Sequence, residues 1–137
     1  MRIDRKMLCL AACVIVTSGS SGNVVERIAA DGSLSNRQLF ARMTDLLPGP
    51  AQPSIWLGPD GMKLGSDGNI FVAHYMGGQV VKMSSDGEFL QSFEIPGIAV
   101  TNLTFYPDDN SMYVAAVEDL TGAPYHGSIW KIDVIGE

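Results

Sequence analysis

The 137-residue sequence predicts an all-β protein, and two observations lead to that class. The first is a pattern of apolar triplet, polar loop, second apolar strand and closing turn that recurs along the chain. The second is a content of 15 Gly and 7 Pro, which favours many turns between short strands over long helices. With 46% hydrophobic and 18% charged residues, the composition is that of a globular protein.

Three units begin with similar apolar triplets, Val14-Ile15-Val16, Ile70-Phe71-Val72 and Met112-Tyr113-Val114. A second apolar strand with a basic residue follows each loop, at 23–28, 79–83 and 127–133. The last residues of the triplets are 56 and 42 positions apart, which brackets the ~40–50 residues of one propeller blade. A β-sandwich of similar strand density is the alternative. The likeness among the units favours about two and a half to three propeller blades of antiparallel meander.

Turn signals separate the strands of each unit. Asp-Gly pairs at 31–32, 67–68 and 86–87 place glycine where a tight hairpin needs a positive φ angle. Residues 35–44 are compatible with a strand or a short helix. Residues 46–58 are rich in Pro, Gly and Ala and predict a surface loop. Antiparallel strands are therefore expected from Val14 onward.

Residues 1–13 precede the repeats and are expected to form a separate N-terminal apolar segment. Three basic residues (Arg2, Arg5 and Lys6) before an apolar run resemble an export signal. The competing interpretation is a leftover strand, with Val14-Ile15-Val16 buried. The repetition of the residues that follow favours this second interpretation, and with it a cytoplasmic location over export.

Charge and cysteine content limit the partners. The net charge is -6 and Lys and Arg are scattered without a basic stripe, so nucleic acid is not an expected partner. No stretch approaches the ~20 apolar residues of a membrane span. Cys9 and Cys13 match no complete zinc pattern and are expected to act as small apolar side chains.

One block of sequence carries a specific resemblance. Pro59-Asp60-Gly61-Met62, the run from Ser66 to Ala73 and Gly77-Gly78-Gln79-Val80-Val81 are similar to a signature block of the gluconolactonase/regucalcin (SMP-30/gluconolactonase/LRE-like) family. The resemblance extends over about residues 14–137 and corresponds to the C-terminal part of the family. It implies a partial six-bladed β-propeller, because members of the family are six-bladed propellers.

The resemblance also implies a chemistry. Members hydrolyse sugar lactones or related esters with a divalent metal in the central channel, most often calcium, with zinc or manganese as substitutes. Asp60 stands where the family has a metal ligand that is also the proposed general base. The family's N-terminal Glu and middle Asn ligands have no equivalent here, because the match begins beyond them.

Physical chemistry supports a metal-binding role for Asp60. A hard cation prefers several oxygen ligands, and carboxylate is the strongest of them. Pro59 and Gly61 are expected to hold Asp60 on a stiff turn at a strand start, and the strand starts of a propeller converge on its channel. Pro-Asp-Gly is also an ordinary turn tripeptide, which is the structural alternative.

Two further residues are candidates for substrate binding. His74 follows an apolar triplet and is expected to face the channel, although a lone His more often has a structural role. Asn102, with Thr101 before it, is a candidate from the next blade. The alternative for Asn102 is a cap at a turn or strand start.

Two functions of different class follow. The first is a metal-dependent lactonase that becomes active when self-association or separate N-terminal blades complete the ring. The second is a non-catalytic propeller fragment or binding module. A six-bladed ring needs about 240–300 residues at ~40–50 per blade, so this chain is expected to leave sheet faces uncovered.

Overall fold

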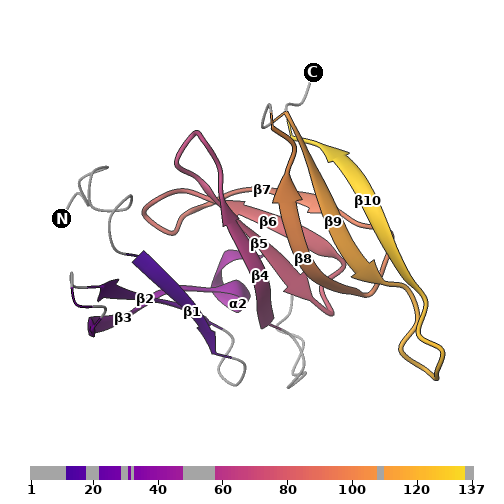
Figure 1. The fold of residues 1–137 in the computed structure, drawn as a ribbon, viewed down its shortest axis with the longest axis horizontal. Coiled ribbons are helices and arrows are strands. Elements are labelled where there is room, and N and C mark those ends of the chain that lie inside the picture. Colours follow the sequence, from indigo (N-terminus) through magenta and orange to yellow (C-terminus); the bar gives the residue numbers. More distant parts are fainter. Residues whose placement is uncertain are drawn as a thin grey trace.

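The structure of the protein is a computed structural model that describes residues 12–17, 22–28, 31, 33–47, 58–107 and 110–134. Ten strands and one helical turn make up the described part (Figure 1). The strands are β1 (Ala12–Thr17), β2 (Gly22–Ile28), β3 (Leu34–Arg42), β4 (Gly58–Leu64), β5 (Ile70–Tyr75), β6 (Gln79–Met83), β7 (Phe89–Glu94), β8 (Ala99–Phe105), β9 (Ser111–Val117) and β10 (Gly127–Asp133). The helical turn, α2 (Met43–Leu46), follows β3.

The strands form three antiparallel sheets that follow one another along the chain and across the molecule (Figure 1). Sheet A contains β1, β2 and β3; sheet B contains β4 to β7; sheet C contains β8, β9 and β10. Within each sheet every strand pairs with the next one in sequence, so each sheet is a meander. The all-β prediction is therefore confirmed. No helix in the described part is long and apolar enough to cross a membrane.

Short-range signals account for the described hairpins. Gly68 and Gly87 have φ angles of 80° and 84°, as the two Asp-Gly pairs predict. The Asp67 carboxylate accepts hydrogen bonds from the Asn69 backbone and carboxamide N–H groups, at 2.9 and 2.7 Å, which closes the β4–β5 hairpin as an Asx turn. Gly32, in the remaining Asp-Gly pair, lies outside the described residues.

Several boundaries differ from those expected. The ambiguous segment 35–44 is both strand and helix, because β3 runs to Arg42 and α2 begins at Met43. Strand β1 begins at Ala12, two residues before the expected strand. Residues 1–11, with Cys9, and most of the predicted loop 46–58 lie outside the described residues. The division into residues 1–13 and 14–137 stays a prediction.

Sheets B and C have the same register, residue for residue. Val72 pairs with Val81 in sheet B, and Val114 pairs with Trp130 in sheet C, as the sequence repeat requires. The equivalence extends to an irregularity in the first strand, which interrupts β4 after Pro59 and β8 after Val100. Strands β4 and β8, which belong to different sheets, thus have an irregularity at equivalent positions, as expected of repeated blades.

The hydrophobic core lies between the sheets. One cluster joins sheet B to sheet C and contains Phe71, Ala73, Val80, Phe93, Ile95, Val100, Leu103, Met112, Val114 and Ala116. A second cluster joins β3 and α2 to the other face of sheet B and contains Ala41, Met43, Ile70, Val72, Val81 and Met83. Because strand side chains alternate between faces, sheet B is apolar on both sides. Full burial of one such large side chain contributes about 1.5–3 kcal/mol.

Candidate functional site

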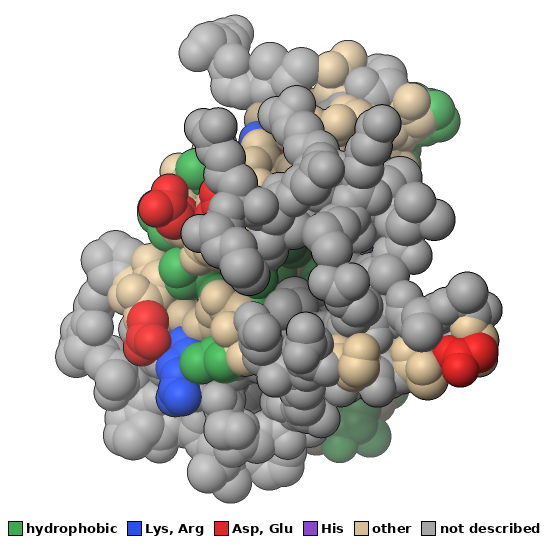
Figure 2. Space-filling view, turned by 90° about the vertical axis from the view of Figure 1, so that its left-hand side faces the viewer, with side chains coloured by type: hydrophobic (Ala, Val, Ile, Leu, Met, Phe, Trp, Pro, Cys, Tyr) green, Lys and Arg blue, Asp and Glu red, His purple; other side chains and the backbone are tan. Residues whose placement is uncertain are grey.

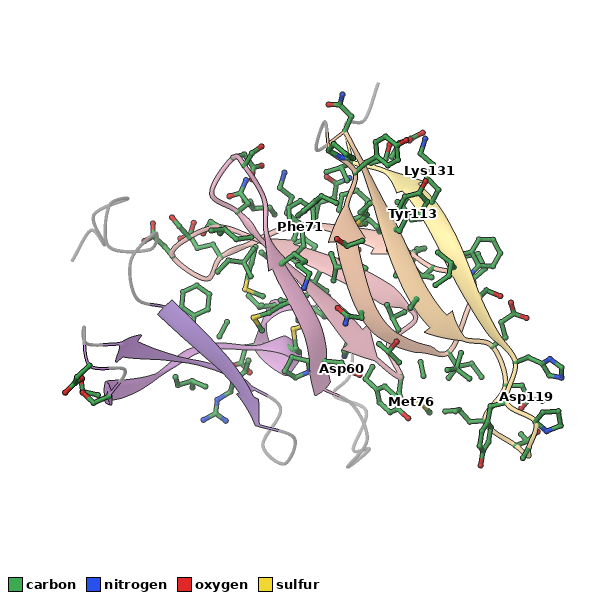
Figure 3. All side chains as sticks on the ribbon, in the orientation of Figure 1. Asp60, Phe71, Met76, Tyr113, Asp119 and Lys131 are labelled. Carbon is green, nitrogen blue, oxygen red and sulfur yellow. The ribbon has the colours of Figure 1, made fainter. Side chains whose placement is uncertain are left out.

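Asp60 lies inside β4, not on a turn before it. Gly58 and Pro59 already pair with Tyr75 and His74, and pairing resumes at Met62, so Asp60 and Gly61 form an irregularity within the strand. The side chain of Asp60 is solvent-exposed, at the end of the sheets where β4 begins (Figure 3). Nearby protein still removes part of its hydration, and this burial raises the pKa of the Asp60 carboxyl above its usual value.

Gly61 brings the start of β4 against β8. A Cβ atom at Gly61 would lie 2.4 Å from Asn102 Oδ1 and 2.8 Å from the Thr101 carbonyl oxygen. Only glycine allows this approach without a shift of one strand. The residue after Asp60 is therefore in contact with Asn102, which places Asp60 and Asn102 on adjacent strands, β4 and β8.

Local hydrogen bonds orient Asn102 and Thr101. Asn102 Oδ1 accepts a hydrogen bond of 2.9 Å from the Leu103 backbone N–H. Thr101 Oγ1 donates to the Ala115 carbonyl oxygen at 3.3 Å. Asn102 remains exposed, and its carboxamide nitrogen is the part of the side chain suited to donate to a ligand.

His74 is buried at the end of β5, opposite Pro59 in the register. Gln79 Nε2 lies 3.3 Å from His74 Nδ1. Because an amide nitrogen only donates, Nδ1 accepts this bond and the ring proton belongs on Nε2. Burial lowers the pKa of the imidazole, so His74 is neutral at pH 7.

The turn after His74 contains features that the sequence hypothesis did not include. Met76 has a φ angle of 60°, which is uncommon for a non-glycine residue. A Cβ atom at Gly77 would lie 1.9 Å from His74 Nδ1, so Gly77 leaves the space that the imidazole fills. Gln79 was not predicted as a partner of His74 either. The Gly77-Gly78 pair, which begins three residues after the histidine, was the available signal for a close contact.

The acidic groups near this end of the sheets do not converge on one point. Figure 3 shows Asp119 on the β9–β10 connection, well apart from Asp60. Asp119 accepts a hydrogen bond from the Thr121 backbone N–H, and Glu118 accepts one from Ser128. Across the ranges that the structure describes, no group of three or more His, Cys, Asp or Glu side chains can hold a metal ion.

Consecutive antiparallel meanders that pack face to face, with first strands that approach one another at one end, define a β-propeller architecture. Residues 15–118 match the family model described as SMP-30/Gluconolactonase/LRE-like region. The chain belongs to this family.

Three relatives illustrate the match. A pentonolactonase of Haloferax volcanii is 35% identical over 129 residues, a match that covers 84% of this chain and 41% of the relative. A solved luciferin-regenerating enzyme superposes with a TM-score of 0.74 at 23% identity, over 93% of this chain and 43% of its own. A regucalcin from Agrobacterium tumefaciens, described as a calcium-binding protein, gives 0.67 at 24% identity, over 89% of this chain and 41% of its own.

These comparisons show which fold the chain has and how much of its relatives' length it spans. The two solved structures have the same fold as this chain over most of its length. The chain spans less than half of the length of the pentonolactonase and of either solved chain.

Proposed function

We propose that this chain forms part of a sugar lactonase site, with Asp60 as the general base. The observation that carries the proposal is the contact of Gly61 with Asn102, which places an exposed carboxylate and an amide donor on adjoining first strands. The 35% identity to a pentonolactonase supports lactone hydrolysis as the chemistry. The substrate class is a small, neutral sugar lactone.

Each residue has a distinct task in this proposal. Asp60 accepts a proton from the attacking water as the general base. Asn102 donates from its carboxamide nitrogen to an oxygen of the lactone, because Leu103 already engages its carbonyl oxygen. His74, neutral and with Nδ1 occupied by Gln79, would donate from Nε2 to the lactone.

A divalent metal, with calcium as the first candidate and zinc or manganese next, belongs to the complete site in this proposal. The solved regucalcin is described as calcium-binding, and a bound metal would polarise the lactone carbonyl. Asp60 would supply one carboxylate, whereas calcium takes 6–8 oxygen ligands. We therefore expect weak binding to the isolated chain, with a Kd of about 10⁻⁴–10⁻³ M.

The experiment compares three samples in a pH-indicator assay on a simple sugar lactone. The isolated chain should show little turnover, with or without calcium. Addition of the N-terminal blades of a family member in trans should raise turnover, and Asp60→Asn in the same mixture should abolish it. The matched control is Asp86→Asn, which changes an exposed carboxylate in the β6–β7 turn and should leave turnover unchanged.

Two results would contradict the proposal. One is strong metal-dependent turnover by the isolated monomer, which would show that other residues make the site. The other is complemented turnover that survives Asp60→Asn.

A second candidate is a non-catalytic propeller fragment or binding module. The observation that favours it is the 41% share of the pentonolactonase that the chain spans. In that case a lactone or its hydrolysed acid should bind without turnover in any of the samples. Calorimetric titration of both compounds into the isolated chain separates this candidate from the lactonase.

A further inference from the structure

The β5–β6 hairpin ends in a cross-strand pair of polar side chains. His74, near the end of β5, is the Cα partner of Gln79, the first residue of β6. Residues 75–78 connect the two strands, and the Gly77 backbone N–H donates to the His74 carbonyl oxygen at 3.0 Å. Because His74 also pairs with Pro59, directly before Asp60, this pair lies beside the start of the first strand of sheet B.

The connection between the two strands holds the imidazole against its backbone. Met76 and Gly78 have φ angles of 60° and 63°, so the chain reverses its direction within a few residues. A Cβ atom at Gly77 would lie 1.9 Å from His74 Nδ1 and 2.4 Å from His74 Cγ. The Gly78 carbonyl oxygen accepts a 2.8 Å hydrogen bond from the Ile95 N–H, which ties the connection to the segment after β7. Backbone atoms therefore set the space that the ring fills.

Gln79 is the hydrogen-bond partner of the ring on this side. Its Nε2 atom lies 3.3 Å from His74 Nδ1. An amide nitrogen donates and does not accept, so the contact requires an Nδ1 without a proton. The neutral ring then carries its proton on Nε2, and His74 offers one hydrogen-bond donor in a fixed direction.

Neutral groups make up this arrangement. Burial lowers the pKa of the His74 imidazole, which keeps the ring uncharged at pH 7. On the side of the molecule drawn in Figure 2, the described acidic side chains lie apart from one another, so the described part of this side has no concentration of negative charge. A neutral donor of fixed direction suits an uncharged acceptor, such as the carbonyl oxygen of a sugar lactone.

We propose that Gln79 is a positioning residue of the lactonase, which holds His74 in the Nε2–H form so that the ring donates to an oxygen of the sugar lactone. This inference rests on the proposed function, in which His74 contacts the lactone. Gln79 acts through His74 and has no contact with the substrate. Without Gln79 the ring is free to change its tautomer, and a lactone oxygen then faces a second acceptor for part of the time, which costs the hydrogen bond.

Nitrogen NMR of the isolated chain tests the hydrogen-bond arrangement without any lactone. In long-range proton–nitrogen correlation spectra at pH 8, the wild-type chain should show His74 with a proton on Nε2 and none on Nδ1. Gln79→Glu keeps the length of the side chain but replaces the donor by an acceptor, so it should place a proton on Nδ1. Gln91→Glu, at an exposed position on β7, is the matched control and should leave both His74 nitrogens as in the wild type.

A double-mutant cycle tests whether Gln79 acts through His74. In the complemented mixture with gluconolactone as the substrate, Gln79→Met should raise KM by about three- to tenfold and change kcat by less than about twofold, the effect of one lost hydrogen bond to the bound lactone. In a chain that already carries His74→Phe, the same Gln79→Met substitution should have no further effect on KM. Circular dichroism and thermal denaturation check that each variant is folded.

Three results would overturn the proposal. The first is a proton on Nδ1 of His74 in the wild-type chain, and the second is an Nδ1 that stays unprotonated in Gln79→Glu. The third is an equal effect of Gln79→Met on KM with and without His74→Phe, which would show a structural role alone. A complemented wild-type mixture without turnover would refute the lactonase and the positioning role together, whereas the NMR spectra would still decide the contact of Gln79 with His74. The two failures are therefore separate results.

Discussion

Glycine at position 61 determines how closely the two candidate site strands approach. Its missing Cβ atom is the reason that Asn102 lies directly beside the β4 backbone. The same reasoning applies to Gly77, which leaves space for the ring of His74. At the scale of single residues, the geometry of the site thus depends as much on the absence of two side chains as on Asp60.

Gly61→Ala should lower the free energy of unfolding by about 1–3 kcal/mol, because the new methyl group overlaps Asn102 and the Thr101 carbonyl oxygen. Urea denaturation measures this change. Gly58→Ala is the matched control in the same strand, since nothing lies within 4 Å of the added Cβ atom. Equal effects of the two substitutions would show that the approach of β4 to β8 is not tight.

His74 should make stability depend on pH in a defined direction. Burial lowers its pKa below the ordinary 6.5, so the unfolded chain takes up the proton first as the pH falls. The contribution of His74 is fully present above pH 6.5 and is lost progressively as the pH falls below that value towards the folded-state pKa.

His74→Gln should therefore flatten the decrease in unfolding free energy on this acid side, measured by urea denaturation at a series of pH values. His126→Gln is the control, because His126 is exposed in the β9–β10 connection. If the unfolding free energy of the wild-type chain falls with pH at the same slope as that of His74→Gln, this would contradict the burial of the imidazole.

At the scale of elements, different side chains close the β4–β5 and β6–β7 hairpin turns. In the β4–β5 turn, the Asp67 carboxylate accepts from Asn69 and also forms a 3.0 Å ion pair with Lys82. In the β6–β7 turn, Ser84 Oγ accepts from the backbone N–H groups of Asp86 and Glu88. Identical Asp-Gly sequences therefore do not imply identical roles for the aspartate.

The pKa of Asp67 reflects its role in the turn. Burial acts to raise this pKa, but the Asn69 N–H groups and the Lys82 ammonium outweigh burial, and the net pKa is lowered. A carboxylate with a lowered pKa contributes stability that is present at neutral pH and is lost as the pH falls through the folded-state pKa.

Asp67→Ala should lower the free energy of unfolding by about 1 kcal/mol, through loss of the Asx turn and of a partly exposed ion pair. Asp86→Ala should have a smaller effect, because Ser84 closes that turn. Thermal denaturation of both variants at neutral pH gives the comparison. A larger loss for Asp86→Ala would reverse the assignment of the two turns.

At the scale of the whole molecule, stability depends on the contacts between sheets. The cluster between sheets B and C includes Met112 and Val114, both fully buried, whereas Tyr113 between them points to the opposite face of sheet C. One face of β9 therefore packs against sheet B, and no described sheet packs against its other face.

Met112→Ala should cost about 2–5 kcal/mol, because it leaves a cavity between the two sheets. Leu64→Ala, at a 51% exposed position on β4, is the control and should change stability by less than about 0.5 kcal/mol. Chemical denaturation of both variants, at a concentration where the oligomeric state is the same, provides the measurement. Similar losses would show that the packing of sheet B on sheet C is not a main source of stability.

The all-β class, the repeated units and two described hairpin turns were predictable from the sequence alone. The reason is that they depend on short-range chemistry: Gly68 and Gly87 adopt the positive φ angles that their turns need, and apolar triplets mark the buried strands. The family was also predictable, because the residues that resemble it lie close together in the sequence, in the block around Asp60. The site assignments of Asp60, His74 and Asn102 stay predictions until their variants are measured.

Only the tertiary structure decided the relations between distant residues. The contact of Gly61 with Asn102, the burial of His74 against Gly77 and the bond from Gln79 depend on how β4, β5, β6 and β8 pack. So does the difference between covered Phe71 and exposed Tyr113, which occupy equivalent positions in the repeat. A local sequence specifies which face of a strand is apolar, but what covers that face is set by segments far away in the chain or outside it.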